Sequence, residues 1–281
     1  MTIIICHDKS STPVPLNDRS FNYGDGFFTT ILTQHKRTIL LDYHLKRLKH
    51  AAEVLGFGQV DWDKLVQSLR AMVTAQPSVI KVLVSRGAGG RGYSPAGLSP
   101  LIYLTAADYP TFYQGWRDNG IQLGISPIQL GLNPLLAGLK HCNRLEQVLI
   151  KKALDKQTYQ DVMVCDLTGC VVECSASNLF WQTDGQWFTP TIDVAGVDGV
   201  MRQFLIDNIL GLTSTKKVKQ TPAALHQASS VFICNSLMGI VPVHSIDSSE
   251  GNGGEGIVHY DIRLARQLSL ELNLELDKLA I

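Results

Sequence analysis

Residues 136–150 read Leu-Ala-Gly-Leu-Lys-His-Cys-Asn-Arg-Leu-Glu-Gln-Val-Leu-Ile, and this stretch carries the most specific pattern in the 281-residue chain. It holds a single lysine, Lys140, between an apolar run and a helix-forming sequence. Asn143 and Glu146 have the spacing of a capping box, which predicts a helix to about Asp155. A partly desolvated lysine favours the neutral amine that Schiff-base chemistry needs, whereas most lysines are only surface charges. Lys140 is therefore a candidate Schiff-base lysine, and other residues that could bind a cofactor are needed to support this role.

The segments on either side of this stretch predict two different α+β units. We expect a small domain over residues 1–108, a linker without periodicity over 109–118 and a larger domain over 119–281. Helices are expected from an N-cap at Asp42 to a stop at Gly56, near 63–74, and over 143–155, 200–210 and 261–272. Strands are expected at 3–6, 27–33, 37–41, 79–85, 101–106, 121–126, 162–166, 171–173, 178–182, 186–188, 230–235 and 240–246, with a flexible surface turn at 251–256.

Composition excludes several classes of protein. Hydrophobic residues make up 45% of the chain and charged residues 18%, an ordinary globular balance. Lys plus Arg equals Asp plus Glu at 25 each, so a nucleic-acid or membrane-surface partner is not expected. No basic signal sequence and no long apolar span is present, which predicts a soluble cytoplasmic protein. The six cysteines form no C-x-x-C pair, so we expect reduced cysteines and no metal.

A glycine-rich loop follows the strand expected at 79–85. Its segment 87–92 satisfies G-x-G-x-x-G, but a dinucleotide site needs a helix to begin there, and Pro95 and Pro100 exclude one. Two interpretations stay open: a loop that presents Arg91 to an anionic ligand, or a solvent-exposed hairpin loop.

Three further features could bind a charged ligand. Glu173 is the only charge in residues 170–175, and a buried carboxylate there would need a cationic partner such as a protonated pyridine nitrogen; an exposed strand-edge glutamate is the alternative. Val200 and Met201 begin a helix whose main-chain N–H groups can bind an anion. Arg47 could complete a phosphate clamp, or be an ordinary surface arginine.

Together and in this order, these residues resemble the fold-type IV pyridoxal 5′-phosphate (PLP) enzymes, which include branched-chain aminotransferases, D-amino-acid transaminases and aminodeoxychorismate lyases. The resemblance covers nearly the whole chain. It is carried by residues 18–26, 44–48, 138–143, 173–180, 199–202 and 234–243. Within the group, residues 28–30, 85–94 and 136–150 are similar to the lyases in particular. The fold implied is α+β, with a smaller N-terminal α/β sandwich and a larger C-terminal domain with a mixed, barrel-like sheet.

The resemblance also implies a role for each candidate. Lys140 would bond the cofactor as a Schiff base, and Glu173 would bind its pyridine nitrogen. The substrate would meet Thr30, which assists proton transfer, together with Arg91, which matches a carboxylate-binding arginine, and Tyr93. The cofactor phosphate would be held by Arg47, the amides of Val200 and Met201, Asn235 and Ser236.

The activity so implied is PLP-dependent elimination from 4-amino-4-deoxychorismate, giving 4-aminobenzoate and pyruvate in folate biosynthesis. A homodimer is implied by the resemblance alone. Two alternatives remain: an aminotransferase of the same fold acting on D-amino or branched-chain amino acids, and a non-catalytic small-molecule binding protein.

Overall fold

The computed structural model describes residues 2–6, 14–211, 214–249 and 256–279. It divides into two compact units, one of residues 1–110 with 139–143 and one of residues 111–138 with 144–281. The division after Pro110 falls inside the predicted linker, whereas the return of residues 139–143 to the first unit was not predicted. Most of the surface turn predicted at 251–256 lies outside the described residues.

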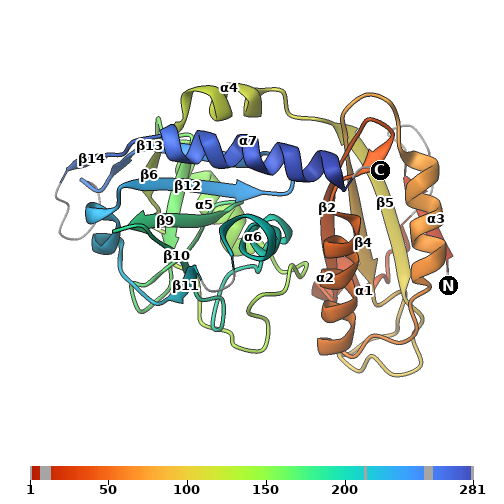
Figure 1. The fold of residues 1–281 in the computed structure, drawn as a ribbon. Helices are drawn as coiled ribbons and strands as arrows, with labels where there is room; N and C mark the ends of the chain where they lie inside the picture. The colour runs from red at the N-terminus through yellow and green to blue at the C-terminus, as the bar shows by residue number, and fades with distance from the viewer. Residues whose placement is uncertain (1, 7–13, 212–213, 250–255, 280–281) are drawn as a thin grey trace. The chain divides into compact units, whose positions relative to one another are not determined.

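The first unit is built on a five-stranded sheet of order β1-β5-β4-β2-β3, in which β1 runs parallel to β5 and the other pairs are antiparallel (Figure 1). Its strands are β1 (Thr2–Cys6), β2 (Gly26–Gln34), β3 (Arg37–Thr38), β4 (Ser78–Ser85) and β5 (Leu101–Asp108). Its helices are α1 (Arg19–Tyr23), α2 (Leu41–Val54) and α3 (Trp62–Met72). Along β2, buried and half-buried residues alternate, so successive side chains point to opposite faces of the sheet.

Local turn chemistry explains how the hairpin leads into α2. His35 and Lys36 both adopt positive φ, which suits a tight two-residue turn between β2 and β3. The predicted N-cap at Asp42 is wrong: Leu40 occupies that position in a left-handed conformation, and Asp42 lies in the first helical turn. There its carboxylate faces the positive end of the helix dipole. Gly56, at φ 61°, ends the helical path as predicted.

The second unit contains a nine-stranded sheet of order β11-β10-β9-β12-β13-β6-β7-β8, with β14 paired to β13. Its strands are β6 (Ile121–Ile125), β7 (Asp161–Cys165), β8 (Val171–Cys174), β9 (Asn178–Thr183), β10 (Gln186–Pro190), β11 (Thr215–Val218), β12 (Ser230–Asn235), β13 (Gly239–Asp247) and β14 (Ile257–His259). Its helices are α4 (Phe112–Asn119), α5 (Leu145–Leu154), α6 (Val200–Leu205) continued by the π-helix η1 (Ile206–Leu210), the 3₁₀-helix η2 (Pro222–Gln227) and α7 (Arg263–Lys278).

The short connection between β8 and β9 requires this sheet to curl. Five strand spacings separate the two strands in the sheet order, which in a flat sheet would be about 24 Å. Only residues 175–177 join them, and the four peptide links from Cys174 to Asn178 span at most about 14 Å. A hydrogen bond of 2.7 Å from the Cys174 N–H to the Ser177 carbonyl closes the turn. The sheet therefore bends back on itself and has the barrel-like form expected.

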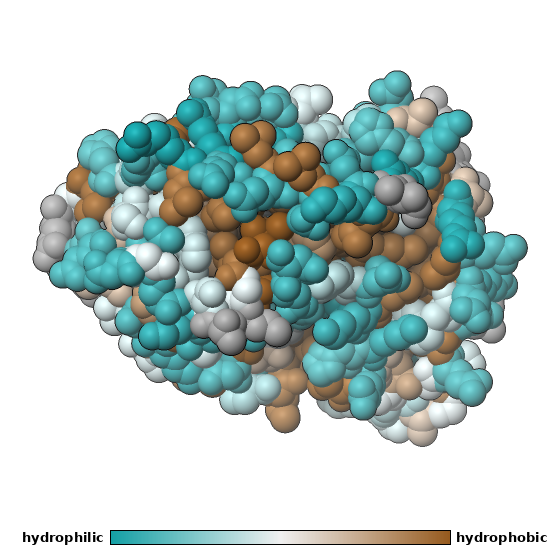
Figure 2. Space-filling view, in the orientation of Figure 1, coloured by the Kyte–Doolittle hydropathy of each residue, from teal (hydrophilic) through white to brown (hydrophobic). Residues whose placement is uncertain are grey.

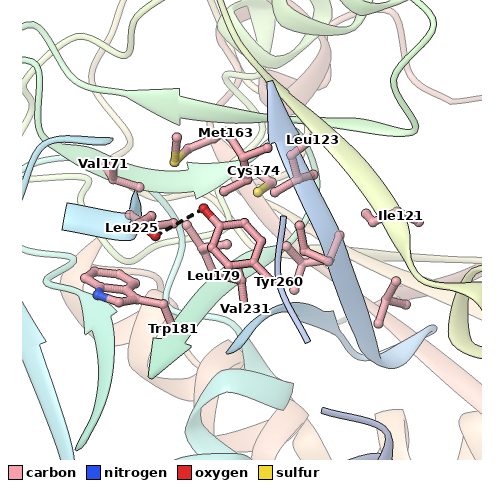
Figure 3. Close-up of a cluster of buried hydrophobic side chains, with 14 of the residues drawn as sticks. Ile121, Leu123, Met163, Val171, Cys174, Leu179, Trp181, Leu225, Val231 and Tyr260 are labelled. Atoms are coloured by element: carbon pink, nitrogen blue, oxygen red, sulfur yellow. Dashed lines mark hydrogen bonds between the residues drawn. The ribbon is translucent and has the colours of Figure 1, made fainter. Parts of the chain in front are cut away.

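Buried side chains fill the concave side of this sheet and form the main core of the second unit (Figure 3). Tyr260 reaches into this cluster, and its hydroxyl donates to the Leu225 carbonyl over 3.1 Å. Helices α4 and α7 both pack on β13, and Figure 1 shows α7 running along β12 and β13. Within the linker predicted at 109–118, residues from Phe112 on form α4, because Tyr113 and Trp116 pack against the core cluster and stabilise a helix that periodicity alone does not reveal.

Helix α5 begins at Leu145, one residue later than an N-cap at Asn143 would place it, and lacks the predicted capping box. The N-cap is Arg144, and the Glu146 carboxylate accepts a hydrogen bond of 2.8 Å from the Gly131 N–H instead of reaching back to Asn143. In a capping box the Glu146 carboxylate would accept from the N-cap N–H, but here it accepts from the loop before the helix.

No helix in the described ranges is long and apolar enough to cross a bilayer. Figure 2 shows a largely hydrophilic face with apolar side chains interspersed over α7, in agreement with the exposure of Leu270 and Leu274. Isolated apolar side chains of this kind are normal on protein surfaces.

The core cluster predicts a contrast between two leucine substitutions. Leu179→Ala removes a fully buried side chain from β9 and should lower the free energy of unfolding by about 2–5 kcal/mol, since it leaves a cavity. Leu270→Ala, at a side chain that is 67% exposed, should change it by less than about 0.5 kcal/mol. Urea unfolding followed by circular dichroism measures both, and equal effects would contradict this assignment of the core.

Candidate active site

The backbone around Lys140 belongs to the first unit because it pairs with the beginning of β2. The Phe28 N–H donates to the Lys140 carbonyl and the Cys142 N–H donates to the Gly26 carbonyl, both over 2.9 Å. A side chain at Gly26 would collide on both sides, since a Cβ there would lie 2.8 Å from the Val84 carbonyl oxygen of β4 and 3.2 Å from Sγ of Cys142. The Lys140 ammonium nitrogen lies 4.9 Å from the centre of the Phe28 ring. The main chain of the candidate lysine is thus fixed, and its half-buried side chain lies over β2.

Thr30 follows Phe28 by two residues in β2, so both side chains point to the same face of the sheet. The structure therefore places the predicted proton-transfer threonine and the Lys140 amine on the same face of the first unit. The same face carries Lys81, which pairs with Thr30 across the sheet and has its nitrogen 4.7 Å from the Phe28 ring centre. Sequence analysis missed Lys81, although it is the only charge in β4.

Arg47 contacts the opposite face of β2. Its guanidinium donates to the Thr29 hydroxyl, which lies 2.6 Å from Nδ1 of His44. Because arginine has no acceptor, the Thr29 oxygen accepts from Arg47. The direction of the bond between Thr29 and His44 depends on the imidazole tautomer. The other ring nitrogen of His44, Nε2, is without a hydrogen-bond partner in the part of the chain that the structure describes. Burial, with the adjacent Arg47 charge, holds the pKa of His44 well below its ordinary value.

Glu173 is buried in the second unit, with 6% of its surface exposed. Its Oε2 accepts a hydrogen bond of 2.9 Å from the Val197 N–H. Gly196 lets the backbone pass this close, since at φ 84° a Cβ would lie 2.5 Å from Cγ1 of Val172 and 3.4 Å from the carboxylate. The exposed alternative for Glu173 is therefore wrong.

Asn178 binds the carbonyl group of Val197, the residue whose N–H group Glu173 binds. Its side-chain amide donates to the Val197 carbonyl over 2.9 Å, and a Cβ on Gly199 would lie 2.0 Å from its oxygen. Gly138 joins this loop from a different part of the chain, donating to the Gly196 carbonyl and accepting from the Asp198 N–H. Sequence analysis missed Asn178, because its role depends on a contact 19 residues away.

Helix α6 begins at Val200, directly after this clamped loop, as predicted. Its N-cap is Gly199, and no side chain caps the first turn, in which both Val200 and Met201 are buried. Helix starts of this kind present main-chain N–H groups to an anion. Val200 and Met201 therefore lie at a helix start with the backbone chemistry expected for a phosphate contact.

Asn235 shapes the turn between β12 and β13. Its side-chain oxygen accepts from the N–H groups of Leu237 and Met238, both at 2.9 Å, and its amide donates to the Ala176 carbonyl over 3.2 Å. The structure thus shows Asn235 joining this turn to the turn that follows Glu173. A direct phosphate contact from Asn235 or Ser236 stays a prediction.

A buried aspartate fixes that second turn. The Asp161 carboxylate accepts hydrogen bonds from the N–H and hydroxyl of Ser175 and, over 3.2 Å, from the Ser177 hydroxyl. Burial raises the pKa of Asp161 from its ordinary value. Asp161 was not predicted; its place at the start of an apolar strand is the signal that could have revealed it.

Arg91 and Tyr93 lie in the loop between β4 and β5, and both are exposed. The chain returns from this loop as a strand without an intervening helix, which confirms that 87–92 is not a dinucleotide fingerprint. No group of three metal-ligating side chains is found among the described residues.

The chain belongs to the family of class IV aminotransferases, whose model matches residues 26–246. The fold class and the PLP cofactor predicted from the sequence are thereby confirmed.

The individual relatives of the chain include lyases and an aminotransferase. The chain is 36% identical over 266 residues to the aminodeoxychorismate lyase of Vibrio harveyi, covering 93% of this chain and 96% of the relative. It is similar to the solved structure of 4-amino-4-deoxychorismate lyase from Pseudomonas aeruginosa, with a TM-score of 0.86, 33% identity, and 95% and 97% of the two chains covered. It is also 27% identical to the D-alanine aminotransferase of Bacillus licheniformis, over 94% of each chain.

The residues present suit the cofactor in their chemistry. Lys140, Thr30 and Arg47 belong to the first unit, and Glu173 and the start of α6 belong to the second. A buried carboxylate matches a protonated ring nitrogen, and an uncapped helix start matches a phosphate.

The low pKa of His44 predicts a pH dependence of stability. Below about pH 6.5 the unfolded chain binds a proton at this residue that the folded chain does not, so the folded state loses stability as the pH falls, by up to about 1.4 kcal/mol per pH unit. In His44→Asn, the side-chain amide can still form a hydrogen bond with the Thr29 hydroxyl but does not titrate. Urea unfolding between pH 7 and pH 5 should therefore show a steeper loss for the unsubstituted protein, and parallel curves would contradict a neutral His44.

Proposed function

We propose that this protein is a 4-amino-4-deoxychorismate lyase that produces 4-aminobenzoate and pyruvate with PLP. The observation that carries the proposal is the full-length similarity to a lyase at 36% identity, against 27% for the D-alanine aminotransferase. The geometry supports it through the buried Glu173 and the fixed backbone of Lys140.

Seven residues would hold the cofactor. Lys140 would bond it covalently and Glu173 would bind its ring nitrogen. The phosphate would be held by Arg47, the amides of Val200 and Met201, and the turn of Asn235 and Ser236. When bound, PLP supplies an electron-withdrawing ring that stabilises negative charge on the carbon attached to the substrate amine. Glu173 sustains this property, because a buried carboxylate keeps the ring nitrogen protonated.

Lys140 would carry the proton transfers. Its neutral amine removes the proton from the amine-bearing carbon of the substrate. The bond between the ring and the enolpyruvyl oxygen then breaks, and Lys140 or the Thr30 hydroxyl delivers a proton so that pyruvate leaves. The atoms of the substrate equal those of the two products, so neither water nor an oxidant enters. Formation of an aromatic ring drives the elimination.

Arg91 would bind a carboxylate of the substrate. A guanidinium holds a carboxylate with two parallel hydrogen bonds, which fixes its orientation as well as its position. Tyr93, two residues further along the same loop, would border the substrate beside it.

Replacement of Lys140 tests the proposal. Lys140→Ala should reduce 4-aminobenzoate formation by at least about 10²–10⁴-fold, because the general base is lost. Lys217→Ala, at an exposed lysine of β11, should leave the rate unchanged. The assay measures 4-aminobenzoate by absorbance and pyruvate through lactate dehydrogenase. Equimolar products support the lyase. Consumption of D-alanine or a branched-chain amino acid without 4-aminobenzoate would instead support the aminotransferase alternative, and near-normal rates in Lys140→Ala would exclude both.

We also propose that the protein forms a homodimer through α5. Leu145, Val148 and Leu149 are 78%, 58% and 49% exposed and share one face of the helix. Leu132 and Leu135, in the preceding loop, are exposed as well. A bond from the Gly131 N–H to Glu146 ties this loop to the helix. Contiguous exposed apolar side chains of this kind mark protein interfaces, and a two-fold interface buries the same patch on both subunits.

A charge on this face should disrupt the dimer. Val148→Glu places two carboxylates in a self-complementary apolar interface, so light scattering after size-exclusion chromatography should give the monomer mass. Leu270→Glu, on the exposed face of α7, should keep the mass of the unsubstituted protein. A monomeric unsubstituted protein, or an unchanged mass for Val148→Glu, would contradict the interface. The cytoplasmic location and the place in folate biosynthesis stay predictions.

A further inference from the structure

Arg19 is a buried arginine whose side chain holds the loop that carries Arg91. Only 3% of Arg19 is exposed. Its Nη1 donates to the Gly92 carbonyl over 2.9 Å and its Nη2 to the Tyr93 carbonyl over 2.8 Å. Its Nε donates to the Asp25 carboxylate over 2.8 Å. The guanidinium thus binds the main-chain carbonyls of the two residues that directly follow Arg91.

These bonds to the Gly92 and Tyr93 carbonyls extend beyond the main-chain pairing of the loop, which involves residues 87–89. The main chain of residues 17–19 pairs with residues 87–89, through bonds of 3.0 Å from the Arg19 N–H to Gly87 and from the Gly89 N–H to Asn17. A Cβ on Gly89 would already press on the Arg19 side chain, at 3.1 Å from its Cδ. Beyond it, Cβ atoms built on Gly90 and Gly92 would meet nothing within 4 Å, so nothing packs against these two residues on the side where a side chain would lie.

Tyr23 and Tyr93 add a second contact at the same place. The guanidinium carbon of Arg19 lies 4.8 Å from the Tyr23 ring centre. The Tyr93 ring meets the Tyr23 ring edge-on, with centres 5.4 Å apart. The contact between Tyr23 and Tyr93 therefore supports the position that the two carbonyl bonds define.

A second arginine, Arg86 at the base of the loop, shares the same carboxylate but binds the end of α2 and not residues 92 and 93. Arg86 lies 3.1 Å from Asp25 and donates to the carbonyls of Leu55 and Gly56 at the end of α2, over 2.8 and 2.7 Å. Its guanidinium also lies 3.8 Å from the Phe57 ring centre. The pair provides a comparison within one buried ion cluster, since Arg19 serves the loop and Arg86 serves the helix end.

We propose that Arg19 is a positioning residue that sets the location of Arg91 and thereby the affinity for the substrate carboxylate. The ligand in this inference rests on the proposed function. If the loop lifts, a buried guanidinium loses two acceptors, which makes the held position the favoured one. A lysine cannot replace the fork, because one ammonium cannot span two successive carbonyls and Asp25 in the same planar arrangement.

The test compares Arg19→Lys with Arg86→Lys, two substitutions that keep the charge of the same cluster. Trypsin cleavage after Arg91, followed by mass spectrometry, reports the loop position without any need for activity. It should be about tenfold faster in Arg19→Lys and unchanged in Arg86→Lys. In the lyase assay with the holoenzyme, Arg19→Lys should raise KM about tenfold, with kcat within about twofold, because uniform substrate binding is lost.

Two further variants complete the design. In an Arg91→Ala background, Arg19→Lys should have no additional effect on KM, since it acts through the missing guanidinium. Tyr23→Ala, at a half-exposed ring, should accelerate cleavage in the same direction and serves if Arg19→Lys fails to fold. Equal cleavage and equal KM in Arg19→Lys and Arg86→Lys would overturn the inference, as would an undiminished KM effect in the Arg91→Ala background. Absence of lyase activity in the unsubstituted protein would overturn the proposed function, whereas the cleavage comparison would still decide the role of Arg19.

Discussion

The peptide segment at Val197 is the constraint on which the candidate site residues of the second unit depend. Its N–H is bound by Glu173 and its carbonyl by Asn178, so the two side chains hold it from both sides. Burial of a carboxylate costs several kcal/mol, and a main-chain N–H bound to a charged group offsets about 1.5–3 kcal/mol of that. A carboxylate held at this depth therefore favours a cation as a partner, and the same clamp sets where α6 begins. The two bonds to this segment thus position both the buried Glu173 carboxylate and the start of α6.

Buried charge is handled in the same way elsewhere in the molecule. Asp161 accepts from main-chain and hydroxyl donors of the turn after Glu173, and Arg19 donates to the main-chain carbonyls of the loop after Arg91. In each case a charged side chain is satisfied largely by backbone groups of an irregular segment. Such a segment is positioned as firmly as a strand, because moving it would leave the buried charge without its partners.

Sequence analysis succeeded for features that depend on residues close together in the chain. Alternation predicted the strands, and a single charge in an apolar run identified Glu173; the same signal applies to Lys81. Features that depend on distant partners were missed. Asn178 has no local pattern, and the capping box failed because the loop at Gly131 binds Glu146. Helix α4 forms through packing of its aromatic side chains on the core, which outweighs its weak local preference.

The Lys140 segment shows why a proton-transfer lysine belongs on a rigid backbone. Gly138 is bonded to the loop at Gly196, and two residues later the Lys140 carbonyl is bonded to β2. The main chain is therefore fixed on either side of Leu139, and only the four side-chain carbons of the lysine remain to move its amine. The four-carbon stem of a lysine keeps several rotatable bonds, so its amine can reach different positions while the main chain stays in place. The proposed removal and return of a proton by Lys140 would require this combination of a fixed main chain and a mobile side chain.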